Sequence, residues 1–505
     1  MNTRFILRVL LPICLLGGTA ACATSSPPDA VPASRLLYTP TPTVAPQSAD
    51  APPGGSPSLA EAAPTPQPHP TRRPPQQITR TYVVQYGDTL SGIAAYLGLT
   101  VEELMEANQL TNADQLQVGQ ELHLPISTPY ISPGEILFPD SEMVYGPAYA
   151  EFDVRTATAA YDGYFHTYTE TLLNGETLSA AELVERVALQ YSVGPRVLLA
   201  LLEAQSHWLT DADPPTDAQT YPLGFVRDGW EGLAAQLMWA ADALNAGFYG
   251  WLYDTLWTFR LEDGSYVQFA PSLNAGTAGV QRALASSPNY AVFLQRLDEV
   301  TETYKRLWGN PFTYTVEPLL PQAEAPTLAL PWPKGKTWYF TGGPHGGWGN
   351  GSAWAAVDFA TDEQNLGCAV SRRWATAAAD GLIVASEDGM ILQDLDGDGF
   401  AGTGWVLLYM HLAAEGRVSV GTQVETGDPI GHPSCEGGQS NASHLHFARR
   451  YNGVWIAADL NTSHPLVMDG WTFLASDRPY DGEMRKQSLV KRAEEDWLPT
   501  NAITH

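Results

Sequence analysis

The sequence is poor in basic residues, with 27 lysines and arginines against 55 aspartates and glutamates and a formal net charge of -28. This balance disfavours nucleic acid and anionic membrane surfaces as partners, because both carry negative charge. Long hydrophobic runs are also lacking. The apolar stretch Val9–Leu16 is too short to cross a bilayer, and no other segment has the pattern of a transmembrane helix. The 505 residues exceed what one hydrophobic core usually serves, so we expect about three domains.

The short apolar stretch follows a basic start and precedes a run of small residues that ends at Cys22. This order is typical of a secretory signal. Its end resembles a lipobox, which implies that Cys22 is lipidated and becomes the mature N-terminus. We therefore expect residues 1–22 to be a lipoprotein signal peptide. The protein would be exported and held at the cell envelope, touching the membrane through its lipid anchor only; the alternative is ordinary secretion.

Residues 23–80 lack apolar periodicity and are rich in proline, alanine, threonine and serine. Such a composition cannot bury a core, so we expect a disordered tether of partly polyproline character. Its reach lies between roughly 40 Å as a coil and about 150 Å when fully extended. We interpret it as a linker that lets the following domains work at a distance from a membrane anchor.

Residues 81–126 alternate between apolar and polar side chains at both ends, which predicts two short strands. Between them, Thr89 and Thr100 are suited to cap two helices. This βααβ segment resembles a LysM domain, a family that binds N-acetylglucosamine-containing glycans such as peptidoglycan. By analogy, the glycan groove would include Gly87, Asp88, Thr89 and Asn108. The alternative is that these residues only form turns and caps.

Residues 140–315 show mostly helical periodicity. It is clearest in Val184–Leu209, Gly232–Ala246 and Tyr290–Trp308. The segment around Gln205-Ser206 faintly resembles soluble lytic transglycosylases, in which a catalytic glutamate directly precedes the serine. Gln205 cannot protonate a glycosidic oxygen. We therefore expect a degenerate, lysozyme-like domain that binds glycan, with a simple helical spacer as the alternative.

The tripeptide His444-Leu-His446 lies in a β-rich segment, where residues two apart point to the same face. Two neutral imidazoles on one face can supply a metal ligand and, beside it, a base for a metal-bound water. Upstream, His345 lies in a glycine-rich loop and Asp358 in the apolar run 355–360. A buried aspartate is costly unless a cation or donors compensate it. One histidine of the pair would complete a three-ligand zinc site with His345 and Asp358. The alternative is that Asp358 only caps a turn and that His345 is a solvated loop residue.

Four motifs follow one another between residues 330 and 475. They are Gly-x-Pro-His345 with Asp358 beyond it, Tyr409-Met-His411-Leu, Cys435-Glu-Gly-Gly and His444-Leu-His446-Phe. The combination resembles the lysostaphin-type zinc endopeptidases, above all their beta-lytic (staphylolysin-like) branch. The resemblance implies an antiparallel all-β zinc peptidase domain that cleaves short peptide bonds in bacterial cell-wall cross-links.

The same resemblance assigns roles to individual residues. It implies that His345, Asp358 and His446 bind zinc, that His444 is the general base, and that His411 assists at the tetrahedral intermediate. The common branch of the family has its first histidine four residues before the aspartate. Trp354 stands there in this chain, so on that template the site would lack a ligand. The spacing of the beta-lytic branch places the ligand at His345 instead.

The chain has only four cysteines. Cys14 lies in the expected signal peptide and Cys22 would carry the lipid, which leaves Cys368 and Cys435 as a pair in an exported domain. Beta-lytic relatives have a disulfide in the corresponding place, so the resemblance implies a Cys368–Cys435 bridge. Two free thiols are the alternative.

An acidic segment carries Asp394, Asp396 and Asp398 at alternate positions and resembles the first half of a calcium loop. The twelfth position is Trp405, where such a loop has a glutamate. A Ca2+ site and a simple acidic hairpin turn therefore remain as alternatives. Beyond it, residues 476–505 form a polar tail that we expect to be helical in character.

These observations predict a multidomain α+β protein: a small LysM domain, a mostly α-helical lysozyme-like domain and an all-β zinc domain. The favoured function is a Zn2+-dependent endopeptidase that hydrolyses peptide bonds in peptidoglycan and is held on the glycan by LysM. The alternative is a non-catalytic, peptidoglycan-binding lipoprotein that activates or recruits another wall hydrolase. In a third interpretation the helical domain is the enzyme and acts on glycan strands through Glu203.

Overall fold

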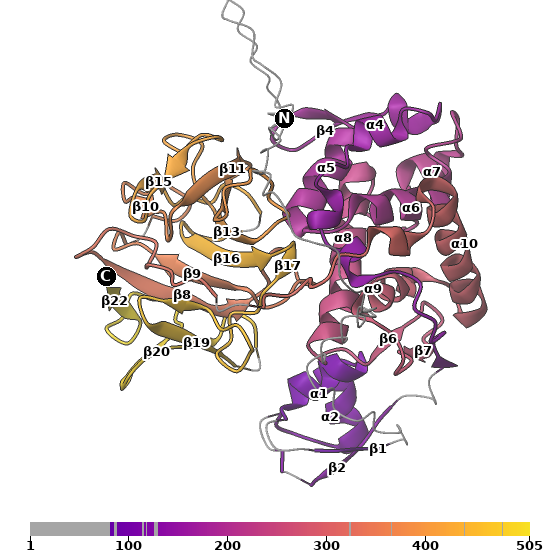
Figure 1. The fold of residues 1–505 in the computed structure, drawn as a ribbon. Helices are drawn as coiled ribbons and strands as arrows, with labels where there is room; N and C mark the ends of the chain where they lie inside the picture. Colours follow the sequence, from indigo (N-terminus) through magenta and orange to yellow (C-terminus); the bar gives the residue numbers. More distant parts are fainter. Residues whose placement is uncertain are drawn as a thin grey trace, which may run out of the picture. The chain divides into compact units, whose positions relative to one another are not determined.

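The computed structural model describes residues 81–84, 88–113, 116–117, 119–125, 130–322, 325–364, 366–438, 440–476 and 478–505 (Figure 1). These residues all belong to one compact unit, Gln67–His505. The predictions for the signal peptide, for Cys22 and for the linker at 23–80 lie outside the described residues. Within the described part, no helix is both long enough and apolar enough to span a membrane.

The first domain has the predicted order strand, helix, helix, strand. Its elements are β1 (Thr81–Val83), α1 (Leu90–Leu97), α2 (Val101–Asn108) and β2 (Glu121–His123). β1 and β2 pair antiparallel. Thr89 caps α1 by accepting a hydrogen bond from the Gly92 N–H, and Thr100 forms a capping box with Glu103 at the start of α2. Both predicted caps are confirmed.

The middle of the chain is a helical domain that begins with a short strand. In chain order its elements are β3 (Tyr130–Ile131), α3 (Asp140–Met143), η1 (Pro147–Tyr149), α4 (Val154–Thr158), η2 (Tyr164–His166), β4 (Thr169–Thr171), β5 (Thr177–Ser179), α5 (Ala180–Tyr191), α6 (Pro195–Ser206), α7 (Thr216–Thr220), α8 (Leu233–Leu252), β6 (Thr258–Arg260), β7 (Tyr266–Gln268), α9 (Ala275–Ala283), η3 (Leu284–Ser286), α10 (Tyr290–Trp308) and η4 (Pro311–Tyr314). α8 is buried along most of its length and packs against α5 and α9. The expected helix at Tyr290–Trp308 has the predicted bounds, and the one expected at Gly232–Ala246 extends to Leu252.

We expected helical structure throughout Val184–Leu209. The structure has two helices there instead of one, because a short turn separates α5 from α6. Ser192 adopts a left-handed conformation with φ 55° and ends α5. Pro195 then occupies the first turn of α6, where its missing N–H costs no hydrogen bond. The apolar periodicity continues across the break, so it gives no sign of the turn.

The C-terminal part is a β domain. Its strands are β8 (Thr337–His345), β9 (Ala356–Ala360), β10 (Ala375–Thr376), β11 (Gly381–Glu387), β12 (Met390–Asp394), β13 (Trp405–Met410), β14 (Gln423–Val424), β15 (Pro429–Gly431), β16 (Leu445–Tyr451), β17 (Val454–Trp455), β18 (Val467–Met468), β19 (Trp471–Ala475), β20 (Gly482–Lys486), β21 (Leu489–Arg492) and β22 (Ala502–Thr504). The large antiparallel sheet has the order β14-β11-β12-β13-β16-β9-β8-β22, with β17 beside β16. A smaller sheet has the order β18-β19-β20-β21.

The segment after residue 475 is not helical, contrary to the prediction. β20 and β21 extend the smaller sheet, and β22 pairs antiparallel with β8 at the edge of the large sheet. Ile503 of β22 is almost fully buried, which explains why this polar segment folds onto the domain. A single apolar side chain among polar ones is too weak a pattern to predict a strand.

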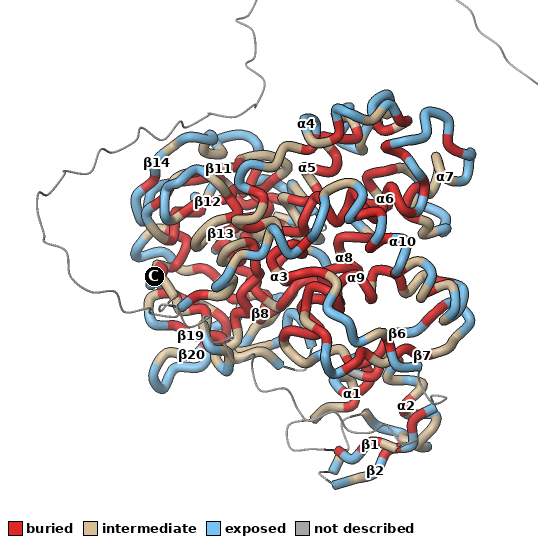
Figure 2. Tube along the Cα trace, turned by 45° about the vertical axis from the view of Figure 1, so that its right-hand side comes forward, coloured by how far each residue is buried: buried red, intermediate tan, exposed pale blue. Residues whose placement is uncertain are grey.

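The two faces of the large sheet pack against different partners. One face contacts an aromatic cluster that includes Trp332, Phe340 and Phe473. On the other face, Ala448 of β16 belongs to a hydrophobic core shared with helices of the middle domain. Strands β12 and β13 are almost wholly buried between these layers (Figure 2). Because side chains alternate along a strand, His446 shares its face with Ala448 and therefore lies on the helical side of the sheet.

Candidate metal centre and active site

Three neighbouring strands bring His345, Asp358 and His446 together. Asp358 is in the middle of β9, opposite His446 of β16 on one side and Gly342 of β8 on the other. His345 ends β8 after two register shifts, which turn its side chain to the same site. All three side chains are buried. The sheet register therefore places three metal-ligating groups on one face.

The ligand atoms of these residues form a compact triangle. His345 Nε2 lies 3.0 Å from His446 Nδ1 and 3.4 Å from Asp358 Oδ1, and His446 Nδ1 lies 3.2 Å from the same oxygen. Ligands about 2.0–2.1 Å from a tetrahedral zinc ion are separated by about 3.3 Å, so the spacing fits zinc. Asp358 Oδ1 is buried and has no hydrogen-bond partner among the described residues. A cation would satisfy that oxygen.

The second nitrogen of each ligand histidine faces a backbone carbonyl. His345 Nδ1 is 2.8 Å from the Gly343 oxygen, and His446 Nε2 is 3.0 Å from the Gly347 oxygen. A carbonyl only accepts hydrogen bonds, so the proton of each neutral ring belongs on these nitrogens. The lone pairs of His345 Nε2 and His446 Nδ1 then point to the centre, as metal ligation requires.

The electrostatics of the centre keep the ligands in their binding forms. Burial lowers the pKa of His345 to about 4, so this ring is neutral at neutral pH. Burial works against ionisation of Asp358, but the neighbouring His345, His444 and His446 hold the pKa of its carboxyl well below its usual range. A neutral imidazole beside a carboxylate is the protonation state that binds a divalent metal.

Two further histidines lie beside the centre without belonging to the triangle. His444 Nδ1 is 2.8 Å from the Ala442 carbonyl, so its Nε2 carries the lone pair and lies 3.8 Å from Asp358 Oδ1. The ring of His411 is 4.5 Å from that of His444, and burial lowers the pKa of His411 to about 3. His411 has φ 65°, an unusual conformation for a residue other than glycine and one that concentrates at functional sites.

The hydrogen bonds of His411 refine its expected role. Its Nδ1 is 3.1 Å from the Glu436 carbonyl, which places the ring proton on that nitrogen. The neutral ring therefore presents a lone pair at Nε2. His411 can donate to a developing oxyanion only after Nε2 has gained a proton, which its lowered pKa disfavours in the resting site.

Tyr480 was missed by the sequence analysis. Its ring stacks on that of His345 with centroids 4.1 Å apart, and its backbone carbonyl accepts a hydrogen bond from the Gly343 N–H. Its φ is 71°, and the residue remains 55% exposed. The only signal in the sequence is the turn-forming run Pro-Tyr480-Asp-Gly, which lies in the segment that we expected to be a helical tail.

A disulfide joins Cys368 and Cys435, with 5.2 Å between the Cα atoms. Cys435 directly precedes Glu436, whose carbonyl orients His411. The bridge thus connects the loop that orients His411 with the segment that follows β9.

Replacing both bridge cysteines by serine is expected to lower the free energy of unfolding by about 4 kcal/mol, because the bridge closes a 67-residue loop in the unfolded chain. Urea unfolding of the full-length protein measures this difference. Reduction of the wild type should reproduce it. An unchanged midpoint in both cases would contradict the loop-entropy explanation.

The acidic loop brings Asp394, Asp396 and Asp398 close enough to share an ion, but most of their oxygens accept hydrogen bonds within the loop. The buried Asp394 carboxylate accepts hydrogen bonds from the Asp396 and Gly399 N–H groups, and burial raises its pKa to about 6. Asp398 accepts from the Phe400 N–H and the Thr403 hydroxyl. These hydrogen bonds stabilise the turn between β12 and β13, and they give no support for a bound calcium ion.

The predicted groove residues of the first domain make contacts that hold the fold. Asp88 accepts a hydrogen bond from the Tyr82 hydroxyl, and Thr89 caps α1. The Asn108 side chain bridges α2 and β2 through Leu104 and His123. Gly87 lies outside the described residues. A role of these residues in glycan binding stays a prediction.

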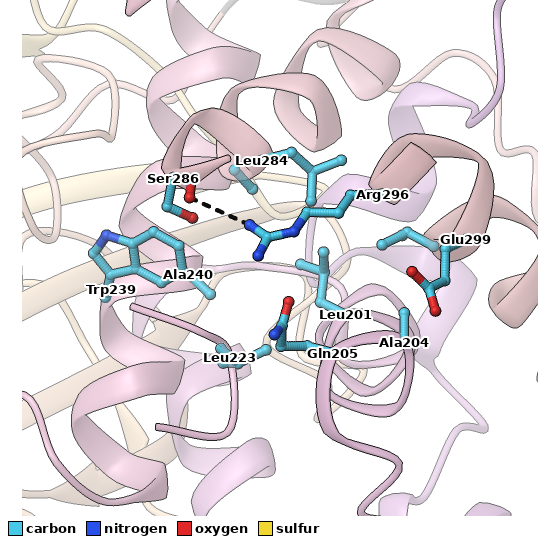
Figure 3. Close-up of a pocket in the computed structure, with 12 residues that line it drawn as sticks. Leu201, Ala204, Gln205, Leu223, Trp239, Ala240, Leu284, Ser286, Arg296 and Glu299 are labelled. Atoms are coloured by element: carbon cyan, nitrogen blue, oxygen red, sulfur yellow. Dashed lines mark hydrogen bonds between the residues drawn. The ribbon is translucent and has the colours of Figure 1, made fainter. Parts of the chain in front are cut away.

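In the helical domain, Glu203 and Gln205 are placed very differently. Gln205 lines a pocket with Trp239, Arg296 and Glu299, from α6, α8 and α10 (Figure 3). Glu203 is fully buried, and its carboxylate accepts hydrogen bonds from the Leu209 N–H and the Thr210 hydroxyl. A buried carboxylate with these partners cannot reach a glycan. The interpretation of Glu203 as a catalytic acid is therefore wrong.

The change Glu203→Gln is expected to leave peptidoglycan cleavage unchanged and to lower the free energy of unfolding by about 1–3 kcal/mol. The reason is that charge-assisted hydrogen bonds to Leu209 and Thr210 are weakened in a buried site. Chemical denaturation and a digestion assay measure the two effects. Loss of cleavage in a folded Glu203→Gln protein would restore the interpretation of the helical domain as an enzyme.

Three parts of the chain match known families. Residues 82–125 match the LysM domain, residues 136–322 match "LasA, N-terminal domain", and residues 364–458 match "Peptidase family M23". The M23 match includes His411, His444 and His446 and begins after Asp358. The match of the helical domain is with LasA, so the expected lysozyme-like fold is not confirmed.

Individual relatives agree with these families. Protease LasA of Pseudomonas aeruginosa is 26% identical over 299 residues, which are 55% of this chain and 67% of LasA. The cortical fragment-lytic enzyme of Bacillus subtilis is 46% identical over 46 residues, 9% of this chain and 11% of that enzyme.

Solved structures that resemble the chain include the M23 metalloprotease pseudoalterin from the deep sea. It has 23% identity and a TM-score of 0.29, over 35% of this chain and 99% of pseudoalterin. The catalytic domain of lysostaphin from Staphylococcus simulans has 27% identity and a TM-score of 0.17, over 24% of this chain and 86% of that domain. From the family matches and the curated relative, the chain carries a LysM domain and a peptidase domain of family M23, and it is homologous to protease LasA.

Proposed function

We propose that this protein is a zinc-dependent endopeptidase that hydrolyses peptide bonds in peptidoglycan cross-links. The observation that carries the proposal is the triangle of His345 Nε2, Asp358 Oδ1 and His446 Nδ1, with sides of 3.0 to 3.4 Å. Each histidine of the triangle has its other nitrogen on a backbone carbonyl. This donor set, with an orphaned buried carboxylate oxygen, is suited to zinc rather than to a structural hydrogen-bond network.

Zinc held by His345, Asp358 and His446 would supply a Lewis acid that lowers the pKa of water and polarises a carbonyl. His444 is placed to take the proton of the attacking water at Nε2 and to return it to the leaving amine. His411 holds a second lone pair next to His444 and becomes an oxyanion donor once it is protonated. The Tyr480 ring stacks on the His345 ring.

The LysM domain supports peptidoglycan as the substrate, because its family binds glycans of that polymer. In this proposal it holds the enzyme on the glycan while the M23 domain cuts the peptides. Export and anchoring at the cell envelope through a lipid on Cys22 are part of the same proposal, with simple secretion as the alternative. They are motivated by the basic and apolar start of the sequence.

The test measures the zinc content of the full-length protein and the products that it releases from purified peptidoglycan. About one zinc per chain is expected, together with new free amines and no new reducing ends. Removing zinc with a chelator should stop amine release, and adding zinc should restore it. Binding to peptidoglycan by a zinc-loaded protein without amine release would favour the non-catalytic alternative. New reducing ends would indicate cleavage of glycan instead of peptide.

A further inference from the structure

The helical domain has a pocket of its own between α6, α8 and α10, which contains none of the metal-site residues (Figure 3). The buried residues that line it are apolar, among them Leu201, Ala204 and Ala240. The enclosed space is about 30 Å³, which holds one or two groups of the size of a water molecule or a methyl group. The pocket is therefore suited to a small apolar end of a larger molecule that lies across its mouth.

The polar side chains at the mouth have hydrogen-bonding groups to spare. Arg296 donates a hydrogen bond to the Ser286 carbonyl at 3.2 Å, and its guanidinium has no other partner among the described residues. The side chains of Glu299 and Gln205 bond to no part of the chain that the structure describes. A guanidinium only donates, a carboxylate only accepts and an amide does both. A ligand that offers both a donor and an acceptor would satisfy all three.

The two charges of α10 do not neutralise each other. Arg296 and Glu299 are three residues apart, where opposite charges on a helix are neighbours, yet the described structure has no ion pair between them. In Figure 3 the Arg296 side chain reaches across the pocket toward Trp239, and Glu299 lies on the opposite side. A free carboxylate in this pocket would be repelled by Glu299, so a neutral amide fits the pair better.

One wall of the pocket is aromatic. The half-buried Trp239 lines the pocket and stacks on Phe225, with ring centroids 4.6 Å apart and an interplanar angle of 7°. Trp230 packs edge-on against Phe225, with centroids 5.4 Å apart. These contacts support the Trp239 ring. A flat aromatic ring at the edge of a pocket is a good surface for the C–H face of a sugar ring.

The loop that supports this wall is held in place by buried hydrogen bonds. Gln236 is fully buried, and its Oε1 accepts a hydrogen bond from the Phe225 N–H at 3.1 Å. Its Nε2 donates to the Phe225 and Trp230 carbonyls, both at 2.8 Å. In the same loop Gly224 has φ 77°, and a Cβ atom there would lie 2.9 Å from Cδ of Gln205. The pocket is thus formed before any ligand binds, which lowers the entropy cost of binding.

We propose that this pocket is a second glycan-binding site, which takes the acetamido group of an N-acetylated sugar. The methyl group enters the apolar space, the carbonyl oxygen accepts a hydrogen bond from Arg296, and the amide N–H donates to Glu299. The sugar ring lies on Trp239, where its hydroxyl groups meet the Gln205 amide. The inference rests on the proposed function only in taking peptidoglycan as the source of the sugar, and the metal centre has no part in it.

The test uses an N-acetylglucosamine tetramer with a photoreactive diazirine on one acetamido group. The full-length protein is irradiated with this probe, and the labelled peptides are identified by mass spectrometry. Labels are expected on α6, α8 or α10 as well as in residues 81–126, where the LysM domain serves as an internal reference. Excess unlabelled tetramer should suppress both sets of labels, whereas a glucose tetramer without acetamido groups should suppress neither. Labels confined to residues 81–126 would overturn the proposal.

Two variants connect the labels to the pocket. Arg296→Ala and Glu299→Ala are each expected to lower labelling of the helical domain about tenfold at probe concentrations below saturation, because each removes a charge-assisted hydrogen bond. Labelling of the LysM domain should not change. Asp298→Ala removes an exposed carboxylate of α10 outside the pocket and is the matched control.

Unchanged labelling of the helical domain in both variants would show that the sugar does not bind in this pocket. Displacement of the probe from the helical domain by a free stem peptide, and not by the unlabelled tetramer, would also overturn the proposal. Labelling of the pocket in a protein that releases no amines would support the second glycan site and count against the proposed endopeptidase. The two proposals can therefore fail separately.

Discussion

The change His345→Ala is expected to remove zinc and to lower amine release from peptidoglycan at least about a thousandfold. His345 contributes one corner of the ligand triangle, 3.0 Å from His446 Nδ1 and 3.4 Å from Asp358 Oδ1. A metal ion contributes several kcal/mol of transition-state stabilisation, and about 4 kcal/mol corresponds to a thousandfold in rate. Metal analysis by mass spectrometry and the amine assay measure the two effects on the same preparation.

A matched control for this change is His432→Ala. His432 lies in the same domain, but its Nδ1 bonds to the Arg373 carbonyl and its ring packs against Trp374. Its loss should leave zinc content and cleavage unchanged. If His345→Ala keeps its zinc, the ligand set is wrong. If His345→Ala loses zinc but still cleaves, the reaction does not depend on the metal.

The features that the sequence predicted best are those with local causes. The period of two along a strand places His444 and His446 together, and an aspartate in an apolar run marks Asp358 as a compensated buried charge. The caps at Thr89 and Thr100 depend only on a hydroxyl three residues before an N–H. Such signals are contained in a few neighbouring residues, so they can be predicted without the tertiary structure.

The features that the sequence did not predict depend on contacts between distant segments. β22 is a strand because β8 offers an unpaired edge more than 150 residues earlier. Tyr480 reaches His345 through the turn between β19 and β20, and Asp242 reaches Gly351 from another domain. In each case the local pattern is an ordinary turn or helix face. Only the packing of the sheets brings the Tyr480 ring against His345.

The change His444→Ala is expected to lower kcat by about a hundredfold to ten-thousandfold while the protein keeps its zinc, because general-base catalysis contributes about that much. His444 Nε2 is 3.8 Å from Asp358 Oδ1, whereas His446 Nδ1 is 3.2 Å from it and 3.0 Å from His345 Nε2. On this geometry we propose His446 as the ligand and His444 as the base. Metal analysis and kcat determination on the same protein measure both quantities.

The comparison with His446→Ala makes this prediction specific. Both variants should be nearly inactive, but only His446→Ala should lose zinc, because its ring completes the triangle with His345 and Asp358. His444→Ala removes a hydrogen bond to the Ala442 carbonyl and a lone pair beside the site, neither of which holds the metal. If His444→Ala loses its zinc and His446→Ala retains it, the roles of the pair are reversed. The Gly347 carbonyl would then orient the base rather than a ligand.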